Sequence, residues 1–350
     1  LSARKNTVAG ARLPCQPAAW LWYDAGMKIL LLGAAGFTGR AAAVLLARRD
    51  DVGELILVDY DIRDAKRLAK ALSPKCRWAM ADVGKPLELS RLLEGIDAVA
   101  SAVGPCAEYE KAILLSCAAG GIAAATIGEG TIAAEDRREI DGVFRDAGVP
   151  AVVGCGMMPG WTELLAAHFL GAGDSAANPQ RPSPATRYLF FSPARFGGYA
   201  FLRGVAKGIT GAAPVPAGAP AGNYFALPDG SRIGVPEGKA GNRLGRIVGT
   251  VGKLGAVGKE FSAALLLWTR GGMTEPAGTP AAIAGVAAGD RFARVEDPRG
   301  NLGAALLAET AVRLAAPAHK ATGLLPLPEL IGREEAEELA ARSGARIVRG

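Results

Sequence analysis

Three glycines that follow a short apolar run constrain the fold of this chain more than any other feature. Residues 29–32 read ILLL, and Gly33, Gly36 and Gly39 follow at intervals of three, ahead of a stretch rich in Ala and Leu. Glycine permits a sharp turn out of a strand, a close backbone approach to a pyrophosphate and tight packing of a helix on a strand. The pattern predicts a strand, a glycine turn and a helix whose N-terminus binds the phosphates of a dinucleotide.

An acidic residue follows the next apolar run at the distance that this interpretation requires. The strand-like residues 54–58 are followed directly by Asp59, which lies 20 positions after Gly39. An acid at that distance binds the ribose 2′-hydroxyl of NAD. Arg63, a few residues further on, is of the type that accepts the 2′-phosphate of NADP. The cofactor is therefore NAD or NADP, and Asp59 favours NAD.

Further strand-like and helical segments alternate as far as residue 153. The six apolar runs of strand type cover residues 29–32, 54–58, 76–81, 98–103, 122–127 and 149–153. Strands that alternate with helices in this way predict a Rossmann fold, a doubly wound parallel sheet that binds ligands at the carboxyl ends of its strands. The residues expected there to contact the cofactor are Gly33, Ala35, Gly36, Phe37, Thr38, Gly39, Asp59, Tyr60, Asp82, Val83, Ala102, Val103, Gly104 and Pro105.

Composition excludes several classes of function. The formal net charge is +6, and basic residues are interleaved with acids, so nucleic-acid binding is not expected. The five cysteines include no Cys-x-x-Cys pair and the chain has two histidines, so we expect no disulfide framework, no metal site and a cytoplasmic location. The apolar runs are shorter than the ~20 residues of a membrane span, so no membrane insertion is expected.

Several stretches together resemble the saccharopine dehydrogenase-like oxidoreductases. They are ILLLGAAGFTGRAAAVLLA, LVDYDIRDAKRLAKAL, DAVASAVGPCAEYEKAILLSCAAGG, VVGCGMMPGWTELLA and, near the C-terminus, VEDPRGNLGAALLAETAVRLA. The resemblance implies an NAD(P)-binding first domain and a C-terminal helix that returns to it. It also implies hydride transfer at a carbon bearing an amine or imine in an amino-acid-like substrate, or reduction of an enoyl group. A small carboxylate-bearing substrate is consistent with the positive net charge.

The chain departs from the family pattern at two positions. Cys106 stands where relatives carry an aromatic residue, and Ala125 where they carry aspartate. No tyrosine is followed by lysine four positions later, so the proton relay of the short-chain dehydrogenases is also missing. These losses leave open an alternative function, a non-catalytic dinucleotide-binding sensor or interaction module.

The domain boundaries follow from composition and from the resemblance. Residues 1–26 are an N-terminal extension without an assigned role, and residues 27–160 form the Rossmann domain. Residues 161–303 form a smaller α+β substrate domain, with strands at 188–192, 223–227 and 232–235, a loop at 212–222 that is suited to cover the site, and a loosely assigned helix at 244–267. Residues 304–350 supply helices that pack back on the first domain. A homodimer is compatible with this organisation.

The candidates for chemistry are few. Tyr109, just past the fourth strand, is suited to donate a proton, or else packs half-buried against the sheet. Glu129, after the fifth strand, is suited to bind a substrate amine or the nicotinamide ribose, or else starts a helix. Arg195 and Arg203 are the arginines considered for a substrate carboxylate, with surface charge as the alternative. Cys106 is expected to be a buried bystander, because neither histidine lies near it in sequence.

Overall fold

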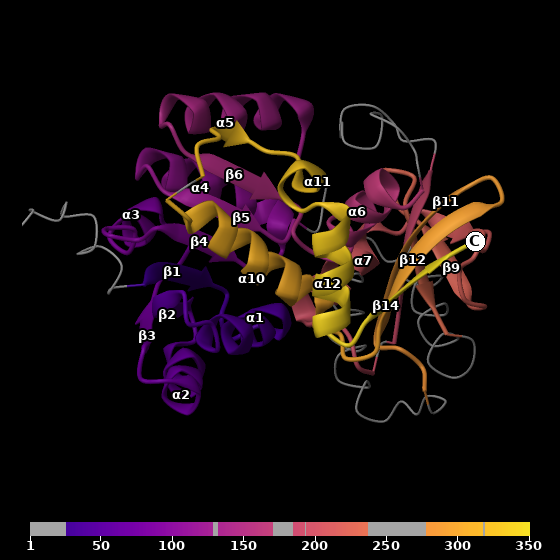
Figure 1. Ribbon diagram of the computed structural model, residues 1–350, viewed down its shortest axis with the longest axis horizontal. Coiled ribbons are helices and arrows are strands. Elements are labelled where there is room, and N and C mark those ends of the chain that lie inside the picture. Colours follow the sequence, from indigo (N-terminus) through magenta and orange to yellow (C-terminus); the bar gives the residue numbers. More distant parts are fainter. Residues whose placement is uncertain (1–25, 129–131, 171–184, 193, 237–277, 318) are drawn as a thin grey trace, which may run out of the picture.

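Two seven-stranded sheets organise the protein and lie side by side in Figure 1. The computed structural model describes residues 26–128, 132–170, 185–192, 194–236, 278–317 and 319–350. Glu129, the predicted helix at 244–267 and nearly all of the N-terminal extension lie outside these residues.

The first sheet is parallel between all of its neighbouring strands. In spatial order its strands are β13 (Gly323–Leu324), β6 (Pro150–Val153), β5 (Ala123–Thr126), β4 (Ala98–Ser101), β1 (Met27–Leu32), β2 (Val52–Asp59) and β3 (Cys76–Met80). The chain builds outward in both directions from the neighbours β1 and β4, so the sheet is doubly wound. This confirms the predicted fold class and places a ligand crevice at the carboxyl ends of those two strands.

Helices bury both faces of this sheet, as the continuous apolar run of β1 requires. Ile29 and Leu31 pack in one core with α1 (Phe37–Ala47), α2 (Ile62–Leu72) and α10 (Leu302–Ala315). Leu30 and Leu32 pack in the other core with α3 (Pro86–Ser90), α4 (Cys106–Ala119) and α5 (Ala134–Asp146). Alternate side chains of the strand therefore enter opposite cores.

The second sheet is mixed and forms most of the other domain. In spatial order its strands are β14 (Arg346–Arg349), β12 (Arg291–Asp297), β11 (Ala282–Ala288), β7 (Thr186–Phe191), β10 (Arg232–Val235), β9 (Asn223–Ala226) and β8 (Gly211–Ala213). The predicted hairpin between β9 and β10 is present. The predicted loop at 212–222 instead begins inside β8, because residues 211–213 pair with β9. The remaining helices among the described residues are α6 (Trp161–His168), α7 (Tyr199–Gly208), α11 (Leu327–Leu330) and α12 (Arg333–Arg342).

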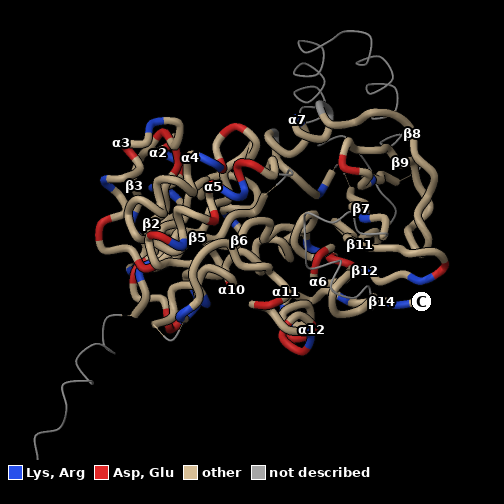
Figure 2. Tube along the Cα trace, turned by 90° about the horizontal axis from the view of Figure 1, so that it is seen from above, with Lys and Arg blue, Asp and Glu red and all other residues tan. Residues whose placement is uncertain are grey.

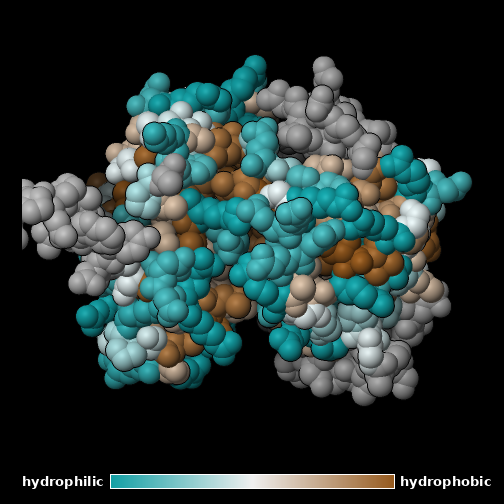
Figure 3. Space-filling model, in the orientation of Figure 1, coloured by the Kyte–Doolittle hydropathy of each residue, from teal (hydrophilic) through white to brown (hydrophobic). Residues whose placement is uncertain are grey.

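The C-terminal segment joins both domains. The nearly fully buried helix α10 packs against α1 and the first sheet, to which β13 adds an edge strand. The helix α12 lies between the two halves of the molecule in Figure 1, and its outer side is hydrophilic in Figure 3. Residues 304–350 were expected to pack on the first domain. Their last strand, β14, instead pairs with β12 in the second sheet.

Figure 2 shows that basic and acidic residues are interspersed over both domains, within the residues that the structure describes. Within the same residues, no helix has both the length and the apolar character needed to cross a membrane. Nor do any three His, Cys, Asp or Glu side chains in the described ranges cluster in a way that would hold a metal ion.

Candidate functional site

A cleft of about 1030 Å³ lies between the carboxyl edge of the first sheet and the second domain. The first domain contributes the glycine turn and the residues that follow β2, β3, β4 and β5. The second domain contributes β7, α7 and the β9–β10 hairpin. All of the predicted cofactor-contacting residues line this cleft except Gly39, which packs beneath the turn.

Each glycine of the turn has its own physical reason. Gly33 has φ +72°, and a Cβ there would lie 2.9 Å from the Ala102 carbonyl carbon. A Cβ on Gly39 would overlap the Gly33 carbonyl oxygen. Gly36 is different, because its backbone is extended and a Cβ would approach only that oxygen, at 3.3 Å. Two glycines therefore permit the turn to form, and the third leaves space on the cleft side.

The start of α1 fits a pyrophosphate. Gly36 is its N-cap, and none of the described side chains accepts a hydrogen bond from the first turn of the helix. Gly36 and the first two residues of the helix, Phe37 and Thr38, line the cleft. Open N–H groups and the helix dipole together favour an anion at this position.

Asp59 supports the glycine turn as well as facing the cleft. Its Oδ2 accepts a hydrogen bond from the Ala35 N–H at 2.8 Å, and its Oδ1 accepts one from the Asp61 N–H at 3.1 Å. The Arg40 Nε donates to the Ala35 carbonyl at 2.7 Å, so the turn is fixed from two directions. Arg63, in contrast, is 92% exposed and does not line the cleft.

The strands on either side of β1 and β2 place further predicted cofactor-contacting residues at the cleft. Asp82 and Val83 follow β3, while residues 102–105 follow β4. Tyr109 lines the cleft with its ring near Gly84, on the side of β3. Cys106 is buried and its Sγ donates to the Val103 carbonyl at 3.2 Å, as expected for a bystander.

The second domain places an arginine in the cleft that the sequence reasoning missed. Arg187 of β7 lines the cleft, and its Nη1 donates to Glu163 Oε1 at 2.9 Å. Arg203 also lines the cleft and forms an ion pair with Glu108 at 3.0 Å, across the two domains. Arg195 does not line the cleft, because its guanidinium is bound to the carbonyls of Thr279 and Pro298, both at 2.6 Å.

The segment between β6 and α6 contributes two methionines to the cleft. Met157 and Met158 line the cleft, but Trp161 does not; its ring is buried and its Nε1 donates to the Leu302 carbonyl at 3.2 Å. The Nε2 of His168 lies 2.8 Å from the Ile331 carbonyl oxygen, so this histidine has a hydrogen-bond partner away from the cleft lining.

A second residue missed by the sequence reasoning is the acid Glu110, which lies behind the cleft wall. It is buried on α4, and its Oε1 accepts a hydrogen bond of 2.5 Å from the Thr126 hydroxyl at the end of β5. The Gly128 N–H also donates to it, and Ile127 and Gly128 line the cleft. Burial raises the pKa of Glu110 to about 7, although its hydrogen bonds and the nearby Arg137 act in the opposite direction.

The doubly wound sheet, the uncapped helix start and the acid after β2 define a nicotinamide-dinucleotide-binding domain. Residues 29–152 match the family model of the saccharopine dehydrogenase NADP binding domain. The family resemblance predicted from the sequence is thereby confirmed for the first domain. No curated protein sequence matches the chain.

One solved structure extends the likeness in fold to the second domain. Saccharopine dehydrogenase (L-Glu forming) from Saccharomyces cerevisiae is 14% identical, covers 93% of this chain and 100% of its own, and superposes with a TM-score of 0.57. A myo-inositol dehydrogenase from Corynebacterium glutamicum is 15% identical over 93% of this chain and 98% of its own, with a TM-score of 0.41. At these identities the likeness to the yeast enzyme shows a shared fold of both domains.

Proposed function

We propose that this protein is an NAD(P)-dependent oxidoreductase that transfers a hydride to or from an amino-acid-like or imine-like substrate carrying a carboxylate. The matched family model and the uncapped start of α1 support the cofactor. When bound, the nicotinamide supplies the hydride chemistry, while the protein orients the substrate and excludes water. The single observation that supports the substrate class is the position of Arg187.

Arg187 has the features of an anion-binding side chain. It projects from a central strand of the second sheet, a more rigid support than a loop. Glu163 fixes it through one oxygen, while the other oxygen of Glu163 accepts hydrogen bonds from the Gly160 N–H and the Thr162 hydroxyl. Because Nη1 makes the one hydrogen bond recorded for Arg187 within the described residues, most of its fork of N–H donors remains for a ligand.

Removal of this cation should weaken substrate binding selectively. We expect Arg187→Gln to raise KM about tenfold for a carboxylate substrate, because hydrogen bonds to charged groups contribute ~1.5–3 kcal/mol. Candidate amino acids and imines are screened by NADH absorbance, each beside its amide or ester, which lacks the carboxylate. The dissociation constant of the dinucleotide should stay unchanged.

Two results would count against this substrate class. Equal turnover of acids and their neutral esters contradicts a role for Arg187 in carboxylate binding. Dinucleotide binding without turnover of any candidate favours the alternative, a sensor module. Arg195→Gln serves as the control, since that arginine is bound to backbone carbonyls outside the cleft lining.

We further propose that the cofactor is NAD. Asp59, Asp61 and Asp64 all line the cleft near the end of β2, where the adenosine ribose is expected. Three carboxylates repel the 2′-phosphate of NADP. The Arg63 side chain is 92% exposed, with its Nε 4.0 Å from Asp61 Oδ1. The matching family model describes an NADP binding domain. The proposed preference for NAD therefore rests on the three acids of this chain and not on the family match.

The preference predicts the response to cofactors and to one substitution. NAD+ at about 100 times its dissociation constant should add ~2.7 kcal/mol to the free energy of unfolding, and NADP+ at the same concentration less. Asp61→Asn should improve NADP+ affinity relative to NAD+ about fivefold, because it removes one repelling charge. The helix should persist, since asparagine caps a helix as well as aspartate and Asp61 is the N-cap of α2.

The matched control is Arg63→Gln, measured by the same calorimetric titrations. We expect no change in the affinity for NAD+ or for NADP+. A loss of NADP+ affinity in Arg63→Gln, with no effect of Asp61→Asn, would instead assign the 2′-phosphate to Arg63.

A further inference from the structure

Glu110 lies behind the part of the cleft wall that the nicotinamide is expected to contact. In a doubly wound sheet the cofactor crosses the switch point, here between β1 and β4. The phosphates belong at α1 and the adenosine beside Asp59, so the nicotinamide falls on the β4–β5 side. Ile127 and Gly128 form the wall after β5. The carboxylate of Glu110 lies behind them and accepts from the Thr126 hydroxyl at the end of β5 and from the Gly128 N–H.

The nicotinamide ring carries a positive charge when it is oxidised and none when it is reduced. A carboxylate close to the ring attracts the oxidised form strongly when the surroundings are poor in water. Glu110 is 6% exposed, so little solvent screens it. We propose that Glu110 discriminates between the redox states of the cofactor, because its ionised carboxylate favours the cationic ring and binding of that ring releases its proton. This inference rests on the proposed dinucleotide cofactor.

The groups that face Glu110 allow both of its charge states. The Thr126 hydroxyl and the Gly128 N–H from the end of β5 donate to the ionised form. Arg137 from α5 attracts the carboxylate, and the buried thiol of Cys155, which follows β6, has its own pKa raised by burial and in part by Glu110. Burial opposes the ionised form, so the pKa of the acid lies near 7 and an added cation can lower it.

Ionisation of Glu110 and binding of the oxidised dinucleotide are thermodynamically linked. If oxidised dinucleotide lowers the pKa of Glu110, it binds more tightly above the pKa of the free protein than below it, and it releases protons near that pKa. A fall of one unit gives about an eightfold lower Kd at about pH 8.5 than at about pH 5.5. At about pH 7 such a shift releases ~0.4 proton per dinucleotide bound. The reduced form should show neither effect.

The experiment is calorimetric titration of the full chain with NAD+ and NADH, each in two buffers of different ionisation enthalpy. The phosphates, riboses and adenine are common to both forms, so their protonation cancels in the difference. If NADP+ and NADPH bind more tightly, the same comparison uses that pair. We expect proton release with the oxidised form alone.

Glu110→Gln separates ionisation from hydrogen bonding. The glutamine oxygen still accepts from the Thr126 hydroxyl and the Gly128 N–H, but the side chain cannot lose a proton. Its pH dependence should be flat, and its ratio of oxidised to reduced affinity should equal that of the wild type at low pH. Glu135→Gln, an exposed acid in the first turn of α5, is the control and should keep the wild-type profile.

Equal proton release with the two forms in the wild type overturns the inference, whether or not Glu110→Gln folds. An unchanged pH profile in a folded Glu110→Gln variant overturns it as well. Failure of all four dinucleotides to bind overturns the proposed function and the inference together. Binding of both redox forms without differential proton release overturns the inference alone.

Discussion

Gly36→Asp is expected to weaken dinucleotide binding at least a hundredfold while the folded protein stays as stable as the wild type. The backbone of Gly36 is extended (φ −71°, ψ 172°), which any residue adopts. An aspartate there is a favoured N-cap and would accept hydrogen bonds from the first turn of α1. Those are the N–H groups that the pyrophosphate needs, and the new carboxylate would repel it by ~4 kcal/mol or less at about 4 Å.

The matched control is Gly36→Asn, which has the same size and an equal capping preference but no charge. Isothermal titration with NAD+ and NADH gives the affinities, and thermal unfolding without ligand gives the stabilities. The asparagine variant should bind more tightly than the aspartate variant, and both should unfold close to the wild type. Wild-type affinity in Gly36→Asp would place the pyrophosphate elsewhere.

The first domain could be predicted from the sequence because its signals are local. Ile29–Leu32 are apolar without alternation, since β1 is buried on both faces, and the glycines that follow are needed by backbone contacts within the turn itself. The acid at Asp59 lies at a fixed distance along the chain because one helix separates two neighbouring strands. Parallel order and site edge then follow from the rule for doubly wound sheets.

The second sheet was harder to predict because its pairings are long-range. Strand β7 lies between β10 and β11, which are separated from it and from each other by long stretches of sequence. Residues 282–288 are small and apolar with a central glycine, a composition with weak strand character. A glycine is needed at position 285 because a Cβ there would overlap the ring of Tyr188 on the neighbouring strand. No local pattern contains that contact.

Two residues of the site, Arg187 and Glu110, could not be predicted from the sequence for the same reason: their contacts are long-range. Arg187 precedes the strand that was predicted at 188–192, and Glu110 lies in an ordinary helix, so neither stands in a recognisable motif. Their importance comes from partners 24 and 16 positions away, Glu163 and Thr126. Arg195 was considered from its position in the second domain, and only the structure shows that backbone carbonyls occupy its guanidinium.

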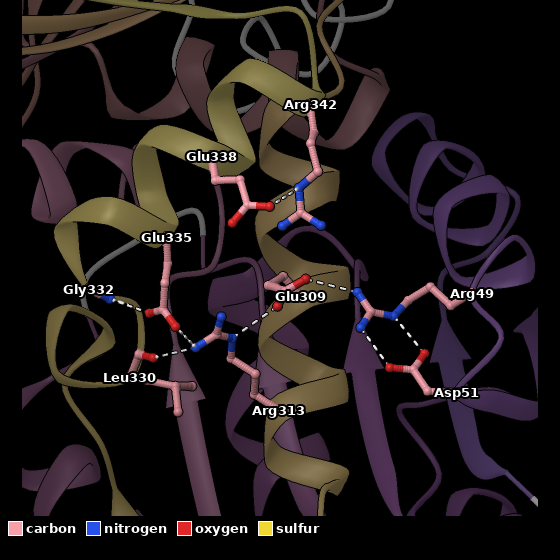
Figure 4. A network of polar contacts seen from close by, with 9 residues as sticks. All are labelled: Arg49, Asp51, Glu309, Arg313, Leu330, Gly332, Glu335, Glu338 and Arg342. Atoms are coloured by element: carbon pink, nitrogen blue, oxygen red, sulfur yellow. Dashed lines mark hydrogen bonds and ion pairs between the residues drawn. The ribbon is translucent and has the colours of Figure 1, made fainter.

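Glu309→Ala is expected to lower the free energy of unfolding by about 3 kcal/mol, because it removes the acid that joins two arginines from different parts of the chain. In Figure 4 this side chain of α10 lies between Arg49 and Arg313. Its oxygens accept from Arg49 Nη1 at 2.9 Å and Arg313 Nε at 3.0 Å, and the side chain is 12% exposed. Without it the two partly buried guanidinium groups lose their shared counter-charge.

The position of this acid explains why its loss should matter and that of a neighbouring ion pair should not. Arg49 also binds Asp51, and Arg313 also binds Glu335 of α12, so Glu309 connects the α1–β2 corner to the C-terminal helix. Glu338→Ala is the control; its side chain is 67% exposed and 3.7 Å from Arg342, so its removal should cost less than about 0.5 kcal/mol. Urea unfolding of both variants decides the matter: equal small losses would mean that Glu309 is as well solvated as a surface acid, and that α10 is held to its neighbours by apolar packing alone.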